Sequence, residues 1–227
     1  MKHSETKIGF TLVELLVVVS IIGLLLAILM PSLSRAREQA KVLVVNVELS
    51  YIAMALEAYA MDNKNIYPPA RADCSGDIAR KHWWSLPLEL ANGSYLPKKT
   101  EGNVEFSNIE DKFNRGCTYK YVAVGTCFDY SGTPFKQYLQ IPPGFPYSQS
   151  DNYSFTGKMN EFYGDPRISP VTWCLFSLGP RYKDGTNTSD GFPVARQFWY
   201  QQKKRSGLII RTRLLKGQQI GTFEATK

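Results

Sequence analysis

The sequence predicts an α+β protein in which a long N-terminal helix packs on a small antiparallel sheet. Three observations lead to this fold class. A run of 21 residues, Phe10 to Met30, contains a single charged residue, Glu14. Beyond Pro31, apolar residues recur at near-helical spacing. In the second half of the 227-residue chain, three segments are rich in strand-forming residues.

The N-terminus divides into a polar segment, 1–9, and the apolar run, 10–30. A helix of this length reaches across the hydrocarbon core of a membrane, which is roughly 30 Å thick. The run is longer than the apolar part of a typical secretory signal, and no A-x-A-like cleavage site follows it. We therefore expect a membrane helix that crosses the bilayer once.

Glu14 is the exception within the apolar run. A carboxylate inside a membrane helix costs about 2.5 to 3.5 kcal/mol on insertion scales, so such a residue is a candidate for function. Glu14 also lies only one turn into the run, where its side chain can reach the membrane interface. The residue type alone leaves both interpretations open.

The segment 31–63 is predicted to continue the helix as an amphipathic half, from about Ser32 to Met61. Its apolar positions are Leu33, Ala36, Ala40, Leu43, Val44, Val47, Ile52, Leu56 and Tyr59. Pro31 should kink or loosen the helix at the junction. Asn63 and the Tyr67–Pro69 run should end it.

The remainder, 64–227, is predicted to be one globular domain of short strands and loops. The strand candidates are 118–124, 171–178 and 207–215, and 82–90 is a candidate short helix. The segment 135–170 is rich in Pro, Gly and Asn and should be an exposed, loop-rich insertion.

Four cysteines, Cys74, Cys117, Cys127 and Cys174, all follow the apolar run. None forms a CxxC pair, so the spacing does not favour zinc or thioredoxin-like chemistry. An even number beyond a membrane helix indicates disulfides in an oxidising compartment. We predict a Cys117–Cys127 bridge and a Cys74–Cys174 bridge, one of three possible connectivities.

The order Gly9, Phe10, Glu14, apolar run and Pro31 resembles the prepilin signal of type IV pilins and type II secretion pseudopilins. The resemblance implies a pilin-like fold and a prepilin peptidase that cuts between Gly9 and Phe10 on the cytoplasmic side. It also implies methylation of the new Phe10 amine. Glu14 would then pair with the Phe10 amine of a neighbouring subunit, because a buried charge needs a partner.

The resemblance further implies a structural subunit of a type IV pilus or a type II secretion pseudopilus, without catalysis of its own. Its partners would be like subunits, the prepilin peptidase, the inner-membrane assembly machinery and the lipid bilayer. It would cross the inner membrane once, with its C-terminal domain in the periplasm, before it joins a filament. The alternatives are a membrane-tethered binding protein or enzyme with an uncleaved anchor, and a DNA-uptake pilin.

A basic cluster near the C-terminus raises the question of nucleic acid. The net charge is +7, and Lys203, Lys204 and Arg205 follow Phe198, Trp199 and Tyr200, with Arg211, Arg213 and Lys216 beyond. Cations beside aromatic residues occur in single-strand binding sites. We interpret them instead as a solvated strand edge, where Lys and Arg discourage edge-to-edge pairing.

A late loop, 179–191, is similar in position to the calcium-binding loop of major pseudopilins. Asp184 and Asp190 would be its ligands, since calcium prefers carboxylate and carbonyl oxygens. Arg181 and Lys183 disfavour a divalent ion, and only two carboxylates remain. We therefore expect a polar turn held by Asx-type hydrogen bonds, and no cofactor.

Overall fold

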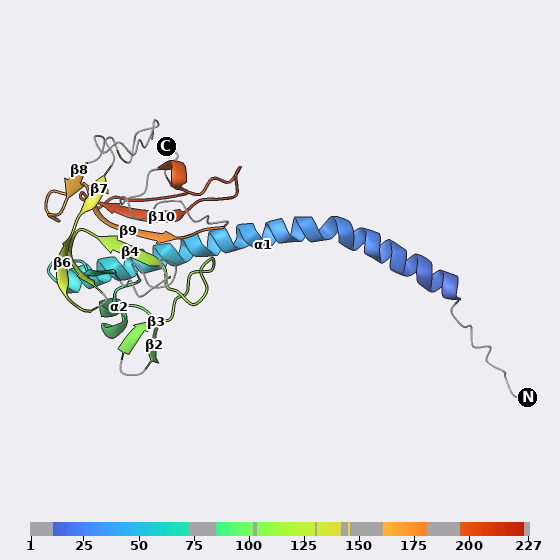
Figure 1. Cartoon of the computed structure of the whole chain (residues 1–227), viewed down its shortest axis with the longest axis horizontal. Coiled ribbons are helices and arrows are strands. Elements are labelled where there is room, and N and C mark those ends of the chain that lie inside the picture. Colours follow the sequence, from blue (N-terminus) through green and yellow to red (C-terminus); the bar gives the residue numbers. More distant parts are fainter. Residues whose placement is uncertain are drawn as a thin grey trace, which may run out of the picture. The chain divides into compact units, whose positions relative to one another are not determined.

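The computed structural model describes residues 11–72, 85–101, 104–129, 131–141, 145, 161–180 and 196–224. The chain forms two compact units, Met1–Lys41 and Val42–Lys227. The helix α1 (Leu12–Asp62, 51 residues) begins in the first unit and ends in the second (Figure 1). The predicted long N-terminal helix is confirmed, and so is the α+β class.

Helix α1 continues without interruption through Pro31, so the junction at this residue does not break the helix. Its end is set by backbone conformation. Lys64 and Asn65 have φ of 56° and 62°, in the left-handed region that a helix cannot continue through. The amide of Asn65 donates to the Ala60 carbonyl at 2.8 Å, and the amide of Asn63 donates to Tyr59 at 3.0 Å. The predicted end at Asn63 is confirmed.

The second unit contains two larger sheets. The antiparallel one has the order β11-β10-β9-β4, and the other has the order β1-β5-β6, with β1 parallel to β5. The described strands are β1 (Ala70–Ala72), β2 (Lys98–Glu101), β3 (Val104–Ser107), β4 (Lys120–Ala123), β5 (Gly125–Asp129), β6 (Pro134–Gln137), β7 (Leu139–Ile141), β8 (Glu161–Tyr163), β9 (Val171–Ser177), β10 (Ile209–Leu214) and β11 (Gln219–Gly221). Two hairpins, β2–β3 and β7–β8, α2 (Leu88–Asn92) and a 3-10 helix, η1 (Arg196–Phe198), complete this part of the chain.

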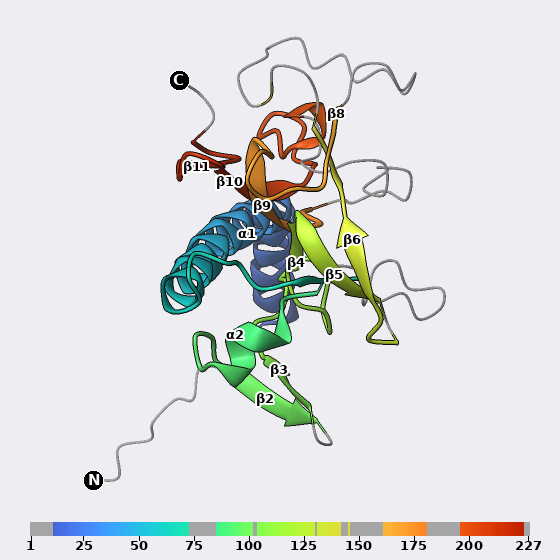
Figure 2. The same cartoon turned by 90° about the vertical axis from the view of Figure 1, so that its left-hand side faces the viewer.

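The four-stranded sheet lies beside the second half of α1, as Figures 1 and 2 show. Because side chains alternate along a strand, β4 and β9 contribute to two separate clusters. Tyr121, Trp173 and Leu175 pack against Leu49, Ile52 and Leu56 of α1 in one cluster. Val122, Cys174 and Phe176 belong to another cluster, on the opposite face of the sheet. Both faces are covered, which explains why every residue of β9 is buried.

The face of α1 that packs on the sheet differs from the predicted one. The buried residues are Val42, Val45, Leu49, Ile52, Ala53, Ala55, Leu56 and Ala60. Of the predicted apolar positions, Ile52 and Leu56 are buried, whereas Leu33, Ala36, Ala40, Leu43, Val44 and Val47 are exposed. The predicted face is wrong at these exposed positions because apolar residues occupy both sides of the helix, so their spacing could not identify the buried side.

Within the second unit, every exposed residue of α1 up to Met61 is apolar. We call these seven residues the outer stripe: Leu43, Val44, Val47, Tyr51, Met54, Ala58 and Met61. At 3.6 residues per turn they fall in a sector roughly 100° wide. The outer stripe is therefore a continuous apolar surface on the side of the helix away from the sheet.

The three strand predictions correspond to β4, β9 and β10 and are confirmed. The short helix was predicted too early. It begins at Leu88, since Pro87 before it has the non-helical angles φ −59° and ψ 136° and disfavours a helical conformation at the residue that precedes it. Part of the predicted loop 135–170 forms strands, namely most of β6 together with β7 and β8.

Candidate functional site

The first turn of α1 is fixed by a reciprocal pair of contacts between Thr11 and Glu14. The amide and hydroxyl of Thr11 donate to Oε2 of Glu14 at 2.9 and 2.8 Å, and the Glu14 amide donates to Oγ1 of Thr11 at 3.2 Å. This is a capping box, in which two otherwise unsatisfied backbone amides are bonded. Its signature, Thr-x-x-Glu before an apolar run, is readable in the sequence, but Thr11 was not among the predicted site residues.

The capping box gives Glu14 a role within its own helix. A single carboxylate oxygen, Oε2, accepts both bonds from Thr11. The predicted partner, the Phe10 amine of a neighbour, would add a second role to the same carboxylate. Gly9 and Phe10 lie outside the described residues, so cleavage and methylation stay predictions.

The apolar part of α1 is exposed throughout the first unit. All residues from Leu12 to Met30 are exposed, and within the described residues α1 is the one helix long and apolar enough to cross a membrane. Surfaces of this kind on a protein are covered by lipid or by another protein. Together with Glu14, this segment has the properties required of a membrane helix that later packs against other helices.

Polar contacts fix the second half of α1 to the sheet. Glu48 accepts a short hydrogen bond from the Tyr119 hydroxyl and pairs with Lys112 at 2.9 Å. One turn before the end of the helix, Oε2 of Glu57 accepts from the Tyr67 hydroxyl at 2.7 Å, and Oε1 accepts from Nε of Arg213 at 2.9 Å. Burial raises the pKa of Tyr67, with the bond to Glu57 as a second cause. The tyrosine therefore stays protonated and donates.

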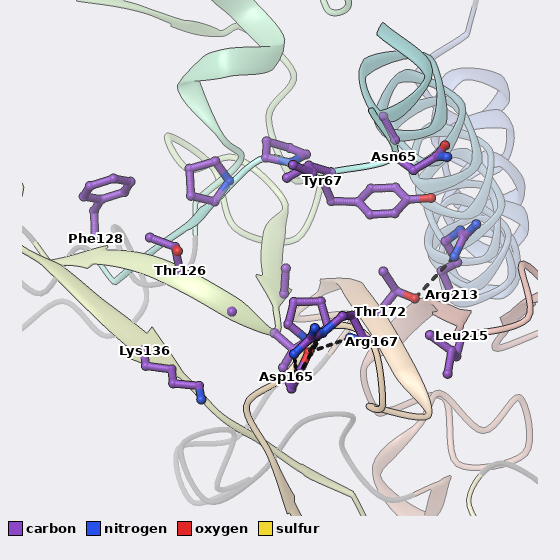
Figure 3. Close-up of a pocket in the computed structure, with 18 of the residues that line it drawn as sticks. Asn65, Tyr67, Thr126, Phe128, Lys136, Asp165, Arg167, Thr172, Arg213 and Leu215 are labelled. Atoms are coloured by element: carbon purple, nitrogen blue, oxygen red, sulfur yellow. Dashed lines mark hydrogen bonds and ion pairs between the residues drawn. The ribbon is translucent and has the colours of Figure 1, made fainter. Parts of the chain in front are cut away.

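A groove lies beside the Glu57 contacts, within the second unit. Its volume is about 1280 Å³, and it is lined by the end of α1, the loop 65–69, the segment 123–128 with most of β5, β6, the turn 165–167, Thr172 of β9 and the segment 213–215 at the end of β10. Figure 3 shows Arg213 and Leu215 on one side, Phe128 and Lys136 on the other, and Asp165 with Arg167 between them. Nothing in the sequence predicted this groove, because its residues come from seven separate segments.

The charges that line the groove are mostly paired. Arg213 bonds to Glu57 and also donates to Oγ1 of Thr172 at 3.3 Å. Arg167 pairs with Asp165 at 2.7 Å, and its guanidinium lowers the pKa of Asp165 to about 2. The groove therefore presents neutralised ion pairs beside apolar side chains.

The basic cluster is largely used within the fold. Arg211 pairs with Glu224 at 2.6 Å, and Arg213 pairs with Glu57. Trp199 and Tyr200 are buried, so their rings do not form an exposed stacking surface. The predicted strand edge is wrong: β10, which carries Arg211 and Arg213, lies between β9 and β11, and the exposed Lys203 and Lys204 belong to a turn.

The structure contains no disulfide among Cys117, Cys127 and Cys174, which are buried thiols. The predicted Cys117–Cys127 bridge is not formed in the structure. Cys127 lies in β5, where it pairs with Ala70 of β1 and Phe135 of β6, whereas Cys117 precedes β4, which belongs to the other sheet. Cys174 is a free thiol that accepts a hydrogen bond from Thr212 at 3.3 Å, and its predicted partner, Cys74, lies outside the described residues.

Like Gly9 and Phe10, the predicted site residues Cys74, Asp184 and Asp190 lie outside the described residues. Among the described residues, no group of three or more His, Cys, Asp or Glu side chains could hold a metal. Calcium at Asp184 and Asp190 stays a prediction.

Lys120 is a buried cation that the sequence did not single out. It is 2% exposed, and its Nζ has no hydrogen-bond partner. Burial lowers its pKa to about 8, against the opposing effects of Cys117 and of Asp111. Asp111 is itself held by the Ser177 hydroxyl at 2.7 Å and the Leu178 amide at 3.2 Å.

We expect Lys120→Met to stabilise the chain. At pH 7 folding moves a charged amine out of water, and removal of that charge should raise the free energy of unfolding by about 1 to 3 kcal/mol. Because the folded pKa lies below the unfolded value of 10.5, the wild-type chain should gain stability between pH 8 and 10.5. Lys120→Met should lose this gain. Thermal unfolding in detergent measures the stability of both chains between pH 7 and 10.5, and Lys203→Met, at an exposed position, is the control. A melting temperature at pH 7 that is lower for Lys120→Met than for the wild-type chain would contradict this prediction.

Comparison with known proteins places these features in a family. The model of the prokaryotic N-terminal methylation motif matches residues 7–30. The type II secretion system core protein G of Pseudomonas aeruginosa is 46% identical over 90 residues, 40% of this chain and 63% of that protein. This match therefore spans less than two thirds of that relative. No solved structure matches the chain.

Two further relatives are covered more fully. The type IV wide pilus major component PilA4 of Thermus thermophilus is 34% identical over 128 residues, 56% of this chain and 82% of that protein. The type II secretion system core protein G of Vibrio cholerae is 31% identical over 106 residues, 45% of this chain and 71% of that protein. Because both relatives are more than 30% identical to this chain and are covered over more than two thirds of their length, the chain belongs to the family of type IV pilins and type II secretion pseudopilins.

Proposed function

We propose that this chain is a structural subunit of a type IV pilus or a type II secretion pseudopilus. The observation that carries the proposal is the exposure of α1. Its apolar surface is uncovered from Leu12 to Met30 and again along the outer stripe. One chain cannot cover this surface by itself. A bilayer can cover the first part before assembly, and like subunits can cover both parts afterwards.

The proposed function includes proteolytic processing of the N-terminus. A peptidase removes residues 1–9, and the mature chain begins at Phe10 with a methylated amine. Cleavage before the apolar run leaves the run attached, so the product stays in the inner membrane with its C-terminal domain in the periplasm. The relatives' names, which include a core secretion protein and a major pilus component, support a filament subunit.

Isolation of filaments from the native source tests the proposed function. Filaments are sheared from cells or purified after overproduction of the chain, and antibodies to the second unit are used to label them for electron microscopy. We expect regular labelling along the filament, and loss of labelling in a strain that lacks the chain. If the chain stays in the membrane as a monomer while other filaments form, the proposal is wrong.

A further inference from the structure

Every residue of the outer stripe is exposed, and no charged or amide side chain is among its members. A helix that faces water normally carries polar and charged residues on its outer side. Four of its large side chains are more than half exposed: Leu43 at 60%, Val47 at 66%, Met54 at 63% and Met61 at 79%. A contiguous apolar surface of this kind indicates contact with another protein.

The groove is the second unpartnered apolar surface of the same unit. Outside α1, six large apolar side chains are exposed in the part of the chain that the structure describes, and three of them, Ile66, Phe135 and Leu215, line the groove. Small-molecule pockets measure about 300 to 1,000 Å³, and the groove, at about 1280 Å³, is larger. It is large enough for a ridge of side chains from another protein.

The electrostatics of the groove suit an apolar occupant. Glu57 is bonded to Arg213, and Asp165 is bonded to Arg167, so an aliphatic ridge would not leave these charges unpaired. Lys136 lies at the edge, where its amine lies 5.4 Å from the centre of the Tyr138 ring. Met61 belongs to both the groove and the outer stripe, so the two surfaces are continuous within one subunit.

We propose that the groove of one subunit binds Leu43, Val44 and Val47 from the outer stripe of a second copy. These residues are the part of the stripe farthest from the groove of their own chain. Along α1, the 14 residues from Leu43 to Glu57 correspond to about 21 Å. The contact joins two different surfaces on two copies, and such a contact builds an open helical array when the rotation between copies does not close into a ring. This inference rests on the proposed function, and it adds which surfaces of the globular units meet.

Photo-crosslinking in the full chain tests the contact. Phe135 is replaced by p-benzoylphenylalanine, which keeps an aromatic ring at a position that is 39% exposed. Filaments and membranes from the native source are irradiated, bands of twice the subunit mass are isolated, and the joined peptides are identified by mass spectrometry. We expect Phe135 to be joined to the α1 peptide that contains Leu43, Val44 and Val47. A crosslink to another segment of a second copy, or to a different protein, overturns the proposal.

A matched pair of variants tests the specificity of the crosslink. Val47→Asp places a charge on the outer stripe, and it should lower the yield of crosslinked dimer by at least about tenfold, because the charge would be buried without a partner. Asn46→Asp adds the same charge one residue earlier, outside the stripe, and should leave the yield unchanged. Equal yields for the two variants overturn the proposal. Filament formation by the unsubstituted chain tests the proposed function separately. If no filament forms, the crosslink in the membrane fraction still tests whether the groove binds α1 of a second copy.

Discussion

Glu14→Val is expected to leave the chain in the membrane with its leader removed, but to abolish its incorporation into filaments. Valine replaces a charge that costs about 2.5 to 3.5 kcal/mol inside an apolar helix, so insertion should improve. The loss of assembly follows if the carboxylate pairs with the Phe10 amine of a neighbour, because that amine would then be buried without a counter-charge. Fractionation of membranes and sheared filaments, followed by immunoblotting, measures both effects.

The capping box provides the control for this prediction. Thr11→Ala removes the hydroxyl that caps the helix but keeps the Glu14 carboxylate, and loss of such a cap costs about 0.5 to 2 kcal/mol of helix stability. We expect Thr11→Ala to reduce filament yield only modestly. If Glu14→Val assembles normally, the glutamate has no role between subunits. If Thr11→Ala abolishes assembly as completely as Glu14→Val, the cap accounts for the requirement.

Gly9→Val is expected to block removal of the leader and therefore to prevent assembly. Glycine at this position lets the peptidase approach the backbone without a side chain in the way, and valine would fill that space. The uncut chain should accumulate in the membrane, and its extra residues 1–9 should be visible as a slower band on a gel. Gly23→Val is the matched control. Gly23 lies within α1 with no atom within 4 Å of an added Cβ, so this variant should be processed normally. Complete processing of Gly9→Val would contradict the assignment of the cleavage site.

The parts of the fold that could be predicted are those set by local pattern. Helix α1 is predictable because its sequence contains no proline other than Pro31, and the helix tolerates that residue. Strands β4, β9 and β10 are predictable because β-branched and aromatic residues are concentrated between turns. The first-turn role of Glu14 is readable from the Thr-x-x-Glu spacing, although the capping box itself was not foreseen.

The parts that could not be predicted depend on contacts between distant segments. The Glu57 contacts join α1 to Tyr67 and to Arg213, which is 156 residues farther along the chain. The buried side of α1 could not be chosen because both sides are apolar. The Cys117–Cys127 bridge was favoured by short separation in sequence, but Cys127 belongs to the β1-β5-β6 sheet and Cys117 leads into β4 of the other sheet. Prediction of the groove would require the positions of β6 and β10 relative to α1, and no local sequence pattern gives these positions.

Mass spectrometry of the N-terminus tests the central claim most directly. The chain is purified from native membranes and from filaments, digested, and its N-terminal peptide is sequenced. A filament subunit of this family should begin at Phe10, carry one added methyl group on the Phe10 amine, and lack residues 1–9 in both fractions. A chain that keeps Met1 and the intact leader, or that is cut beyond Met30 and so loses its apolar helix, would contradict the assignment as a pilin-like subunit.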